Sequence, residues 1–282
     1  MPASPSSSAQ TAREALAVRL KHLRVDAGLT GKELSARCGW HPAKTTRIQK
    51  GEAAPSDADI RAWCTACGAD SQADDLIATA RAVDSMYVEW RRLQRNGMRQ
   101  IQESVYALNE QSSHQRVYVS NVMPGFFQTP AYASALMESI TDFHGTPNDV
   151  TEAVAARVAR SRFLYEGGHR YAVIMEEAVL RYRIGDRETM DGQLRHLLTV
   201  MRLPSVSLGV IPFGTERTVW PLEAFYLFDG SRVVVETLTA EVNVVQPREL
   251  ADYARAFDKL SKMAVFGDRA RAHITSAVDA LG

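Results

Sequence analysis

Three basic residues lie close together in the segment Gly39–Glu52, whose sequence is GWHPAKTTRIQKGE. They are Lys44, Arg47 and Lys50, with Thr45 and Ile48 between them. On a helix such residues could contact DNA phosphates, and Lys and Arg can also donate hydrogen bonds to guanine O6 and N7. The same pattern also fits an ordinary solvated helix face, so the surrounding sequence has to discriminate between the two.

The charge around this segment is unevenly distributed. Nine Lys and Arg residues stand against three acidic residues between positions 13 and 50, whereas two Arg stand against eight acidic residues between positions 51 and 90. The first stretch therefore carries a net charge of +6 and the second a net charge of −6. A basic block of this kind is expected on a surface that meets a polyanion.

The whole-chain composition is that of a globular protein and gives no information about binding partners. The 282 residues include 45% hydrophobic and 23% charged residues, and the 33 basic and 33 acidic residues cancel. No apolar run is long enough to span a bilayer, and three cysteines cannot all pair within one chain. We expect a reduced, cytoplasmic protein without membrane contact, whose Ser/Pro/Ala-rich residues 1–11 form a disordered tail.

Residues 12–80 have the periodicity and capping residues of a helical domain. A first helix from about Arg13 ends at Gly28, and Thr30 with Glu33 forms a capping-box pattern for a second helix near 31–38. A third helix opens at His41 and Pro42 and ends at Gly51. Ser56 or Asp57 caps a fourth helix, and a fifth begins near residue 72.

Within the third helix, Thr45 and Ile48 are spaced three apart and should face the core. Two short helices joined by a Gly-containing turn are typical of a helix-turn-helix, whose second helix enters the major groove. The segment from 20 to 56 carries a resemblance to the phage-repressor-like (xenobiotic-response-element type) helix-turn-helix family, which extends over about residues 12 to 80. The matching positions are Leu20, Leu23, Arg24, Gly28, Leu29, Thr30, Glu33, Leu34, Ile48, Gly51, Glu52 and Pro55.

This resemblance implies roles for the exposed residues. Members of the family often have Gln where this chain has Gly31, so one phosphate contact shifts to Lys32, and Gln49 stands where Glu is usual. The candidates for contacts with base edges are Ala43, Lys44, Thr46 and Arg47. The candidates for contacts with phosphates are Thr30, Lys32, Arg37, His41 and Lys50.

Cys64 and Cys67 form a C-x-x-C pattern on the expected fourth helix. A structural zinc site normally needs four ligands, and no second C-x-x-C or H-x-x-x-H pattern is present. We expect small buried hydrophobes rather than a metal site, with a redox switch as the alternative. The sequence implies no cofactor.

After a helical linker over residues 81–113, the sequence alternates β-rich runs with helices. Short β-rich runs begin near residues 116, 170, 206, 224 and 232, and Asp229-Gly230 predicts a hairpin turn between the last two. Helices are expected at 149–166, 187–202, 247–266 and from there to Leu281. Residues 114–282 should therefore form an α+β domain with a mixed or antiparallel sheet.

The sequence does not predict an enzyme. It has no G-x-S-x-G, H-E-x-x-H, phosphate-binding loop or dinucleotide fingerprint. Glu176 and Glu177 are adjacent on an expected strand, where neighbouring side chains point to opposite faces, so they should not share a catalytic task.

Motifs such as MPGFFQTPAYASAL, ARVARSRFL and MDGQLRHLLTV resemble the uncharacterised C-terminal domain that follows this helix-turn-helix in many actinobacterial regulators. Phe126 and Phe127 stand where the family usually has leucines, and Ser161 stands where Gln is frequent. The position of the domain implies sensing or oligomerisation. The candidates for a ligand pocket are Phe126, Phe127, Tyr132, Arg157, Arg160, Trp220, Phe225 and Glu236; core packing and structural ion pairs are the alternative.

Together these features predict a mainly α helix-turn-helix domain followed by an α+β domain that senses a ligand or a protein partner. The expected function is a transcriptional regulator that binds double-stranded DNA, as a homodimer on a pseudo-palindromic operator. The effector would be a small molecule or a small protein. The alternative is an antitoxin-like module that binds a small partner protein and uses the helix-turn-helix for autoregulation.

Overall fold

The structure, a computed structural model, describes residues 5–282; for residues 5–11, 82, 84–89, 91, 92 and 96 it describes only the backbone. The chain divides into two compact units, Met1–Val88 and Glu89–Gly282. The segment 81–113, which we expected to be a linker, is thereby shared between the units. None of the described helices is long and apolar enough to cross a bilayer.

The first unit is helical, as expected. Its elements are α1 (Pro5–Asp26), α2 (Gly31–Arg37), α3 (Pro42–Gln49), α4 (Asp57–Cys67), the 3-10 turn η1 (Asp70–Gln72) and α5 (Ala73–Met86). Helix α1 begins at Pro5, inside the segment 1–11 that we expected to be a tail, because neither Pro nor Gly interrupts residues 6–26. Residues 1–4 lie outside the described part of the chain.

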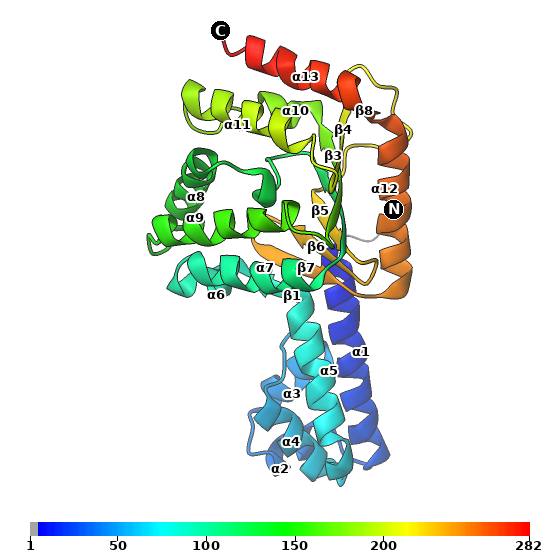
Figure 1. Cartoon of the computed structure of the whole chain (residues 1–282). Helices are drawn as coiled ribbons and strands as arrows, with labels where there is room; N and C mark the ends of the chain where they lie inside the picture. The colour runs from blue at the N-terminus through cyan, green and yellow to red at the C-terminus, as the bar shows by residue number, and fades with distance from the viewer. Residues whose placement is uncertain (1–4) are drawn as a thin grey trace. The chain divides into compact units, whose positions relative to one another are not determined.

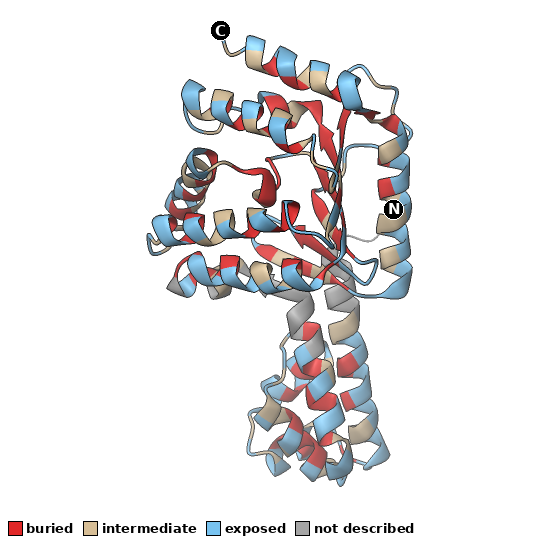
Figure 2. Cartoon of the chain, viewed as in Figure 1, coloured by how far each residue is buried: buried red, intermediate tan, exposed pale blue. Residues whose placement is uncertain are grey.

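The core of this unit is built from the inward faces of α1 to α5. Leu20, Leu34, Ile60 and Trp63 are fully buried, and Ile48 is nearly so. The indole Nε1 of Trp63 donates a 3.0 Å hydrogen bond to the Leu20 carbonyl, which links α4 to α1. Buried and exposed positions alternate along these helices in Figure 2, and α3 is therefore held through one face only.

The second unit combines a sheet with helices, which confirms the α+β expectation. The chain enters it through β1 (Tyr87–Glu89). The strands that follow are β2 (His114–Val119), β3 (Arg170–Glu176), β4 (Val206–Ile211), β5 (Phe225–Phe228), β6 (Arg232–Glu236), β7 (Ala240–Val244) and β8 (Val265–Phe266). The helices and 3-10 turns are α6 (Trp90–Leu93), η2 (Gln94–Asn96), α7 (Arg99–Gln111), η3 (Gly125–Phe127), α8 (Pro130–His144), α9 (Val150–Ala159), η4 (Arg160–Leu164), α10 (Glu177–Arg181), α11 (Arg187–Val200), α12 (Pro247–Met263) and α13 (Gly267–Asp279).

The sheet is mixed, with the strand order β1-β7-β6-β5-β2-β3-β4-β8. Strands β2, β3 and β4 are parallel, whereas β5, β6 and β7 form an antiparallel run beside β2. The expected hairpin joins β5 and β6, and both turn residues have the positive φ that it requires, 48° at Asp229 and 70° at Gly230. Strands β1, β7 and β8 were not predicted. Strand β1 interrupts the segment 81–113, which was expected to be helical, β7 alternates with polar residues, and β8 has two residues.

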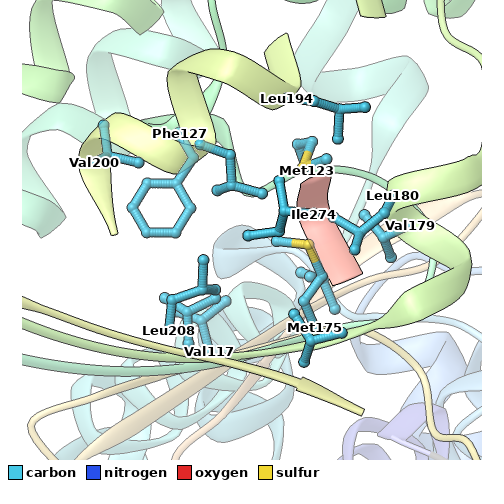
Figure 3. Close-up of a cluster of buried hydrophobic side chains, with 14 of the residues drawn as sticks. Val117, Met123, Phe127, Met175, Val179, Leu180, Leu194, Val200, Leu208 and Ile274 are labelled. Atoms are coloured by element: carbon cyan, nitrogen blue, oxygen red, sulfur yellow. The ribbon is translucent and has the colours of Figure 1, made fainter. Parts of the chain in front are cut away.

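Helices cover both faces of this sheet (Figure 1): α12 lies against one face, and α7, α9 and α11 lie on the other. The larger apolar core lies on the second face. Figure 3 shows strand residues such as Val117 and Leu208 converging with Phe127 and Leu194 in this cluster. Because this core includes Phe127 and Phe126, the turn around η3 is anchored to the sheet by its aromatic side chains.

Candidate nucleic-acid interface

Helices α2 and α3 begin at capped positions that their sequences specify. The Thr30 hydroxyl accepts from the Glu33 backbone N–H at 3.2 Å, and the Glu33 carboxylate accepts from the Thr30 N–H at 2.7 Å. His41 caps α3 by accepting from the Ala43 N–H at 3.3 Å, with Pro42 in the first turn. Gly39, at φ 67°, turns the chain between the two helices. Thr30 and His41, both phosphate candidates, thus also serve as helix caps.

A buried polar contact sets the rotation of α3 against α2. The hydroxyls of Ser35 and Thr45 are 2.7 Å apart and hydrogen-bonded, and Ser35 also donates to the Gly31 carbonyl. Both residues are almost completely buried, as is Ile48. The prediction that Thr45 and Ile48 face the core is therefore confirmed.

The opposite face of α3 carries the candidate base-contacting residues. Ala43, Thr46 and Arg47 are all exposed. The Thr46 hydroxyl donates to the Pro42 carbonyl at 3.1 Å, so its methyl group and the acceptor lone pairs of its oxygen remain available. The guanidinium of Arg47 has no hydrogen-bond or ion-pair partner among the described residues, which leaves all its donors for an external acceptor.

Lys44, the fourth base-contact candidate, is engaged within the protein. Its Nζ lies 2.6 Å from the Asp59 carboxylate and 4.5 Å from the centre of the Trp40 ring. Burial acts to raise the pKa of Asp59, but hydrogen bonds from Lys44 and Ser56 outweigh burial and lower it. Lys44 therefore links α3 to α4 through a charged pair, a contact with a residue fifteen positions away that local pattern did not indicate.

The other phosphate candidates differ in whether their side chains are already bonded within the protein. Lys32 is exposed and has no side-chain partner among the described residues. Arg37 donates to the Ala66 carbonyl at 3.0 Å, where it closes the C-terminal end of α4. Lys50 lies 3.7 Å from Glu52 in an exposed pair, which is weak and can exchange for a phosphate. Lys32 and Lys50 are thus the more available cations.

The three cysteines are free thiols in the first unit. Cys64 is fully buried, and burial raises the pKa of Cys67 to about 11. A thiol with a raised pKa holds little of the reactive thiolate at neutral pH. No cluster of His, Cys, Asp or Glu among the described residues could hold a metal ion.

The structure disperses the eight pocket candidates. Phe126, Phe127 and Tyr132 belong to the larger core of the second unit. Phe225 lies among Tyr118 and Tyr253 instead, while Trp220 is 61% exposed in the loop before β5. The remaining three, Arg157, Arg160 and Glu236, belong to one polar cluster, as described below.

Two glutamines that sequence patterns did not single out hold the arginines of this cluster. The amide oxygen of Gln102 accepts from Arg157 Nε at 3.0 Å and from Arg160 Nη2 at 2.8 Å. That of Gln128 accepts from Arg157 Nη1 at 2.8 Å. Gln128 lies in the quoted motif MPGFFQTPAYASAL, so a local clue existed, whereas nothing near Gln102 set it apart.

Glu176 and Glu177 have separate partners. Glu176 receives two hydrogen bonds from Arg217, at 2.7 and 2.6 Å, and one from the Tyr118 hydroxyl. Glu177 contacts Arg181 and His273. The two carboxylates thus belong to different ion-pair networks.

Comparison with known proteins adds two family matches. The model described as a domain of unknown function (DUF5753) matches residues 102–276, and a model described as a helix-turn-helix domain matches residues 15–77. No curated protein matches the chain. Among solved structures, the chain is similar to TrmBL2, an archaeal chromatin protein whose structure shows a novel mode of DNA binding. The identity is 10%, the TM-score 0.32, and the match covers 79% of this chain and 70% of that one, a similarity too low to carry functional information.

Proposed function

Because the chain belongs to the family defined by the domain of unknown function DUF5753 and has a helix-turn-helix domain before it, we propose that it is a sequence-specific, DNA-binding regulator of transcription. In this proposal α3 enters the major groove and presents Ala43, Thr46 and Arg47 to base edges. The observation that carries it is the exposed guanidinium of Arg47, which has no partner among the described residues, on a helix whose other face is buried through Thr45 and Ile48.

The electrostatics of the first unit support the same role. Lys32 precedes α3 on α2 and Lys50 follows it, and both are exposed. Such residues suit phosphate contacts, which orient a protein on DNA without selecting sequence. Lys44 has a structural role instead, because its hydrogen bond to Asp59 holds α3 against α4.

The second unit would supply regulation and assembly. One helix-turn-helix covers only a short half-site, so tight binding calls for a dimer on a pseudo-palindromic operator with half-sites about 34–36 Å apart. We assign to the second unit the dimer contact and the sensing of a small molecule or small protein partner, in the cytoplasm and without a catalytic step.

A genome-wide binding map tests this function. The full chain should occupy discrete sites that share a pseudo-palindromic motif, and a variant with Arg47→Ala should occupy these sites more weakly. Occupancy confined to the chain's own promoter, and dependent on a co-purifying small protein, would favour the antitoxin-like alternative. Diffuse occupancy without a shared motif would contradict sequence-specific binding altogether.

A further inference from the structure

A cluster of charged and polar side chains lies in the second unit where α9 ends and η4 begins. Arg157 is on the last turn of α9, and Arg160 opens η4 with 6% of its surface exposed. Three hydrogen bonds to described side chains hold the two guanidinium groups, all of them accepted by the neutral amide oxygens of Gln102 and Gln128.

These two positive charges lack a directly paired carboxylate. No Asp or Glu oxygen of the described residues lies within ion-pair distance of either guanidinium. Each guanidinium offers about five N–H donors, so most donors of the pair remain unused. The Nε of Arg160 is buried and has no partner in the described structure. Buried charges are normally paired, and a buried donor without an acceptor is costly.

The sheet supplies the facing wall of the cluster. Tyr226 on β5 is opposite Val234 on β6, so Glu236, two residues further along β6, points to the same face as Tyr226. Burial raises the pKa of the Tyr226 hydroxyl and outweighs the Gly125 backbone, which acts to lower that pKa. A Cβ on Gly125 would stand 3.3 Å from Arg160 Nη2, so glycine lets the turn lie close against the arginines.

The cluster also reaches solvent. Arg157 and Tyr226 are half-buried and Glu236 is exposed. Even so, desolvation raises the pKa of Glu236, and desolvation together with the neighbouring Arg157 lowers the pKa of Arg160 to about 9. Arg157, Tyr226 and Glu236 therefore leave the cluster accessible to a ligand from solvent.

We propose that this cluster binds a small molecule through an anionic oxygen group, carboxylate or phosphate, held between Arg157 and Arg160, with Glu236 facing a hydrogen-bond donor of the same molecule. Guanidinium groups bind such oxygens in bidentate fashion, and here Gln102 and Gln128 already hold them in place. The inference deepens the proposed sensing role of the second unit and rests on it. It also explains why the buried Arg160 and the half-buried Arg157 have neutral acceptors.

Anion-dependent stability of the full chain tests the proposed anion site. Thermal unfolding and calorimetric titration with inorganic phosphate, acetate and succinate are compared with chloride at equal ionic strength. At least one oxyanion should stabilise the wild-type protein, and the preferred probe distinguishes a carboxylate from a phosphate ligand. The response should vanish in Arg157→Gln and persist in Arg162→Gln, since Arg162 is half exposed and pairs with Glu110 and Glu166.

The inference is overturned if no oxyanion stabilises the wild-type chain, or if Arg157→Gln responds as the wild type does. If Arg157→Gln does not fold, Glu236→Gln decides the matter, because its side chain is exposed and the change removes a facing negative charge. This variant should bind the probe several-fold more tightly; unchanged affinity would refute the site. Gel shifts without added anion, run in parallel, keep the two proposals apart, because DNA binding can persist when the anion response fails.

Discussion

Arg47 and Lys44 lie one turn apart on α3, yet their side chains have different surroundings. The sequence predicted that both face away from the core, and both are exposed. It could not predict that Lys44 pairs with Asp59 and covers Trp40, because these contacts depend on how α4 packs. At the residue scale, pattern therefore identifies the face, and packing decides which of its side chains are free.

Arg47→Ala should weaken binding to the operator by about 1–3 kcal/mol, because a guanidinium that donates to a guanine edge is lost. Binding to scrambled DNA should change little. Gel-shift titrations on both DNAs measure this, with Arg61→Ala as the control, since Arg61 is an exposed arginine on α4 paired with Asp74. Unchanged operator affinity would contradict the assignment of Arg47 to a base contact.

Lys50→Ala should weaken binding to the operator and to scrambled DNA equally, because a phosphate contact carries no sequence information. The slope of log affinity against log salt should fall by about one unit. The measurement is the same titration repeated over a range of salt concentrations. A selective loss on the operator would instead mean that Lys50 contacts a base.

Asp59 should stabilise the first unit in a pH-dependent manner. Its folded pKa is lowered, so its contribution is present above the unfolded pKa of about 3.9 and is lost as pH falls through the folded value. Wild-type protein and Asp59→Asn should differ most in urea midpoint near neutral pH, and the difference should shrink as pH falls through the lowered pKa of Asp59. A constant difference across this range would show that the charge of Asp59 contributes nothing.

The capping residues were the most informative part of the sequence at the scale of elements. The capping box at Thr30 and the cap at Ser56 start α2 and α4 where predicted. In the second unit the β-rich runs correctly predicted strands β2 to β6. Strand β7 was missed because polar residues alternate with apolar ones along it. The pocket residues were the least predictable. Phe127 and Tyr132 belong to the apolar core, and Gln102, which is distant in sequence, contacts the arginines only in the folded chain.

Thr45→Val should loosen the α2–α3 unit, because it leaves the buried Ser35 hydroxyl without its partner on α3. The expected cost is about 1 kcal/mol. Hydrogen exchange of the α2 and α3 amides should speed up in this variant. The control is Thr46→Val, the same substitution at the adjacent exposed position, which should be nearly neutral; equal exchange in both variants would contradict a structural role for the Ser35–Thr45 contact.

At the scale of the whole molecule, the chain devotes far more residues to its second unit than DNA contact requires. We expect the full chain to be a dimer in light scattering and the fragment 1–88 to be a monomer, because the dimer contact is assigned to the second unit. A full-length chain that remains a monomer when bound to its operator would contradict this assignment. Gel filtration over a range of protein concentrations would show whether the association is reversible.

Selection of bound sites from random double-stranded DNA tests the central claim, sequence-specific binding through α3, most directly. The wild-type chain should enrich a pseudo-palindrome whose half-sites are about one helical turn apart. Arg47→Ala should relax the preference at one base pair of each half-site while the remaining positions persist. Enrichment of no motif by the wild-type chain, or of the same motif at full strength by Arg47→Ala, would contradict the claim.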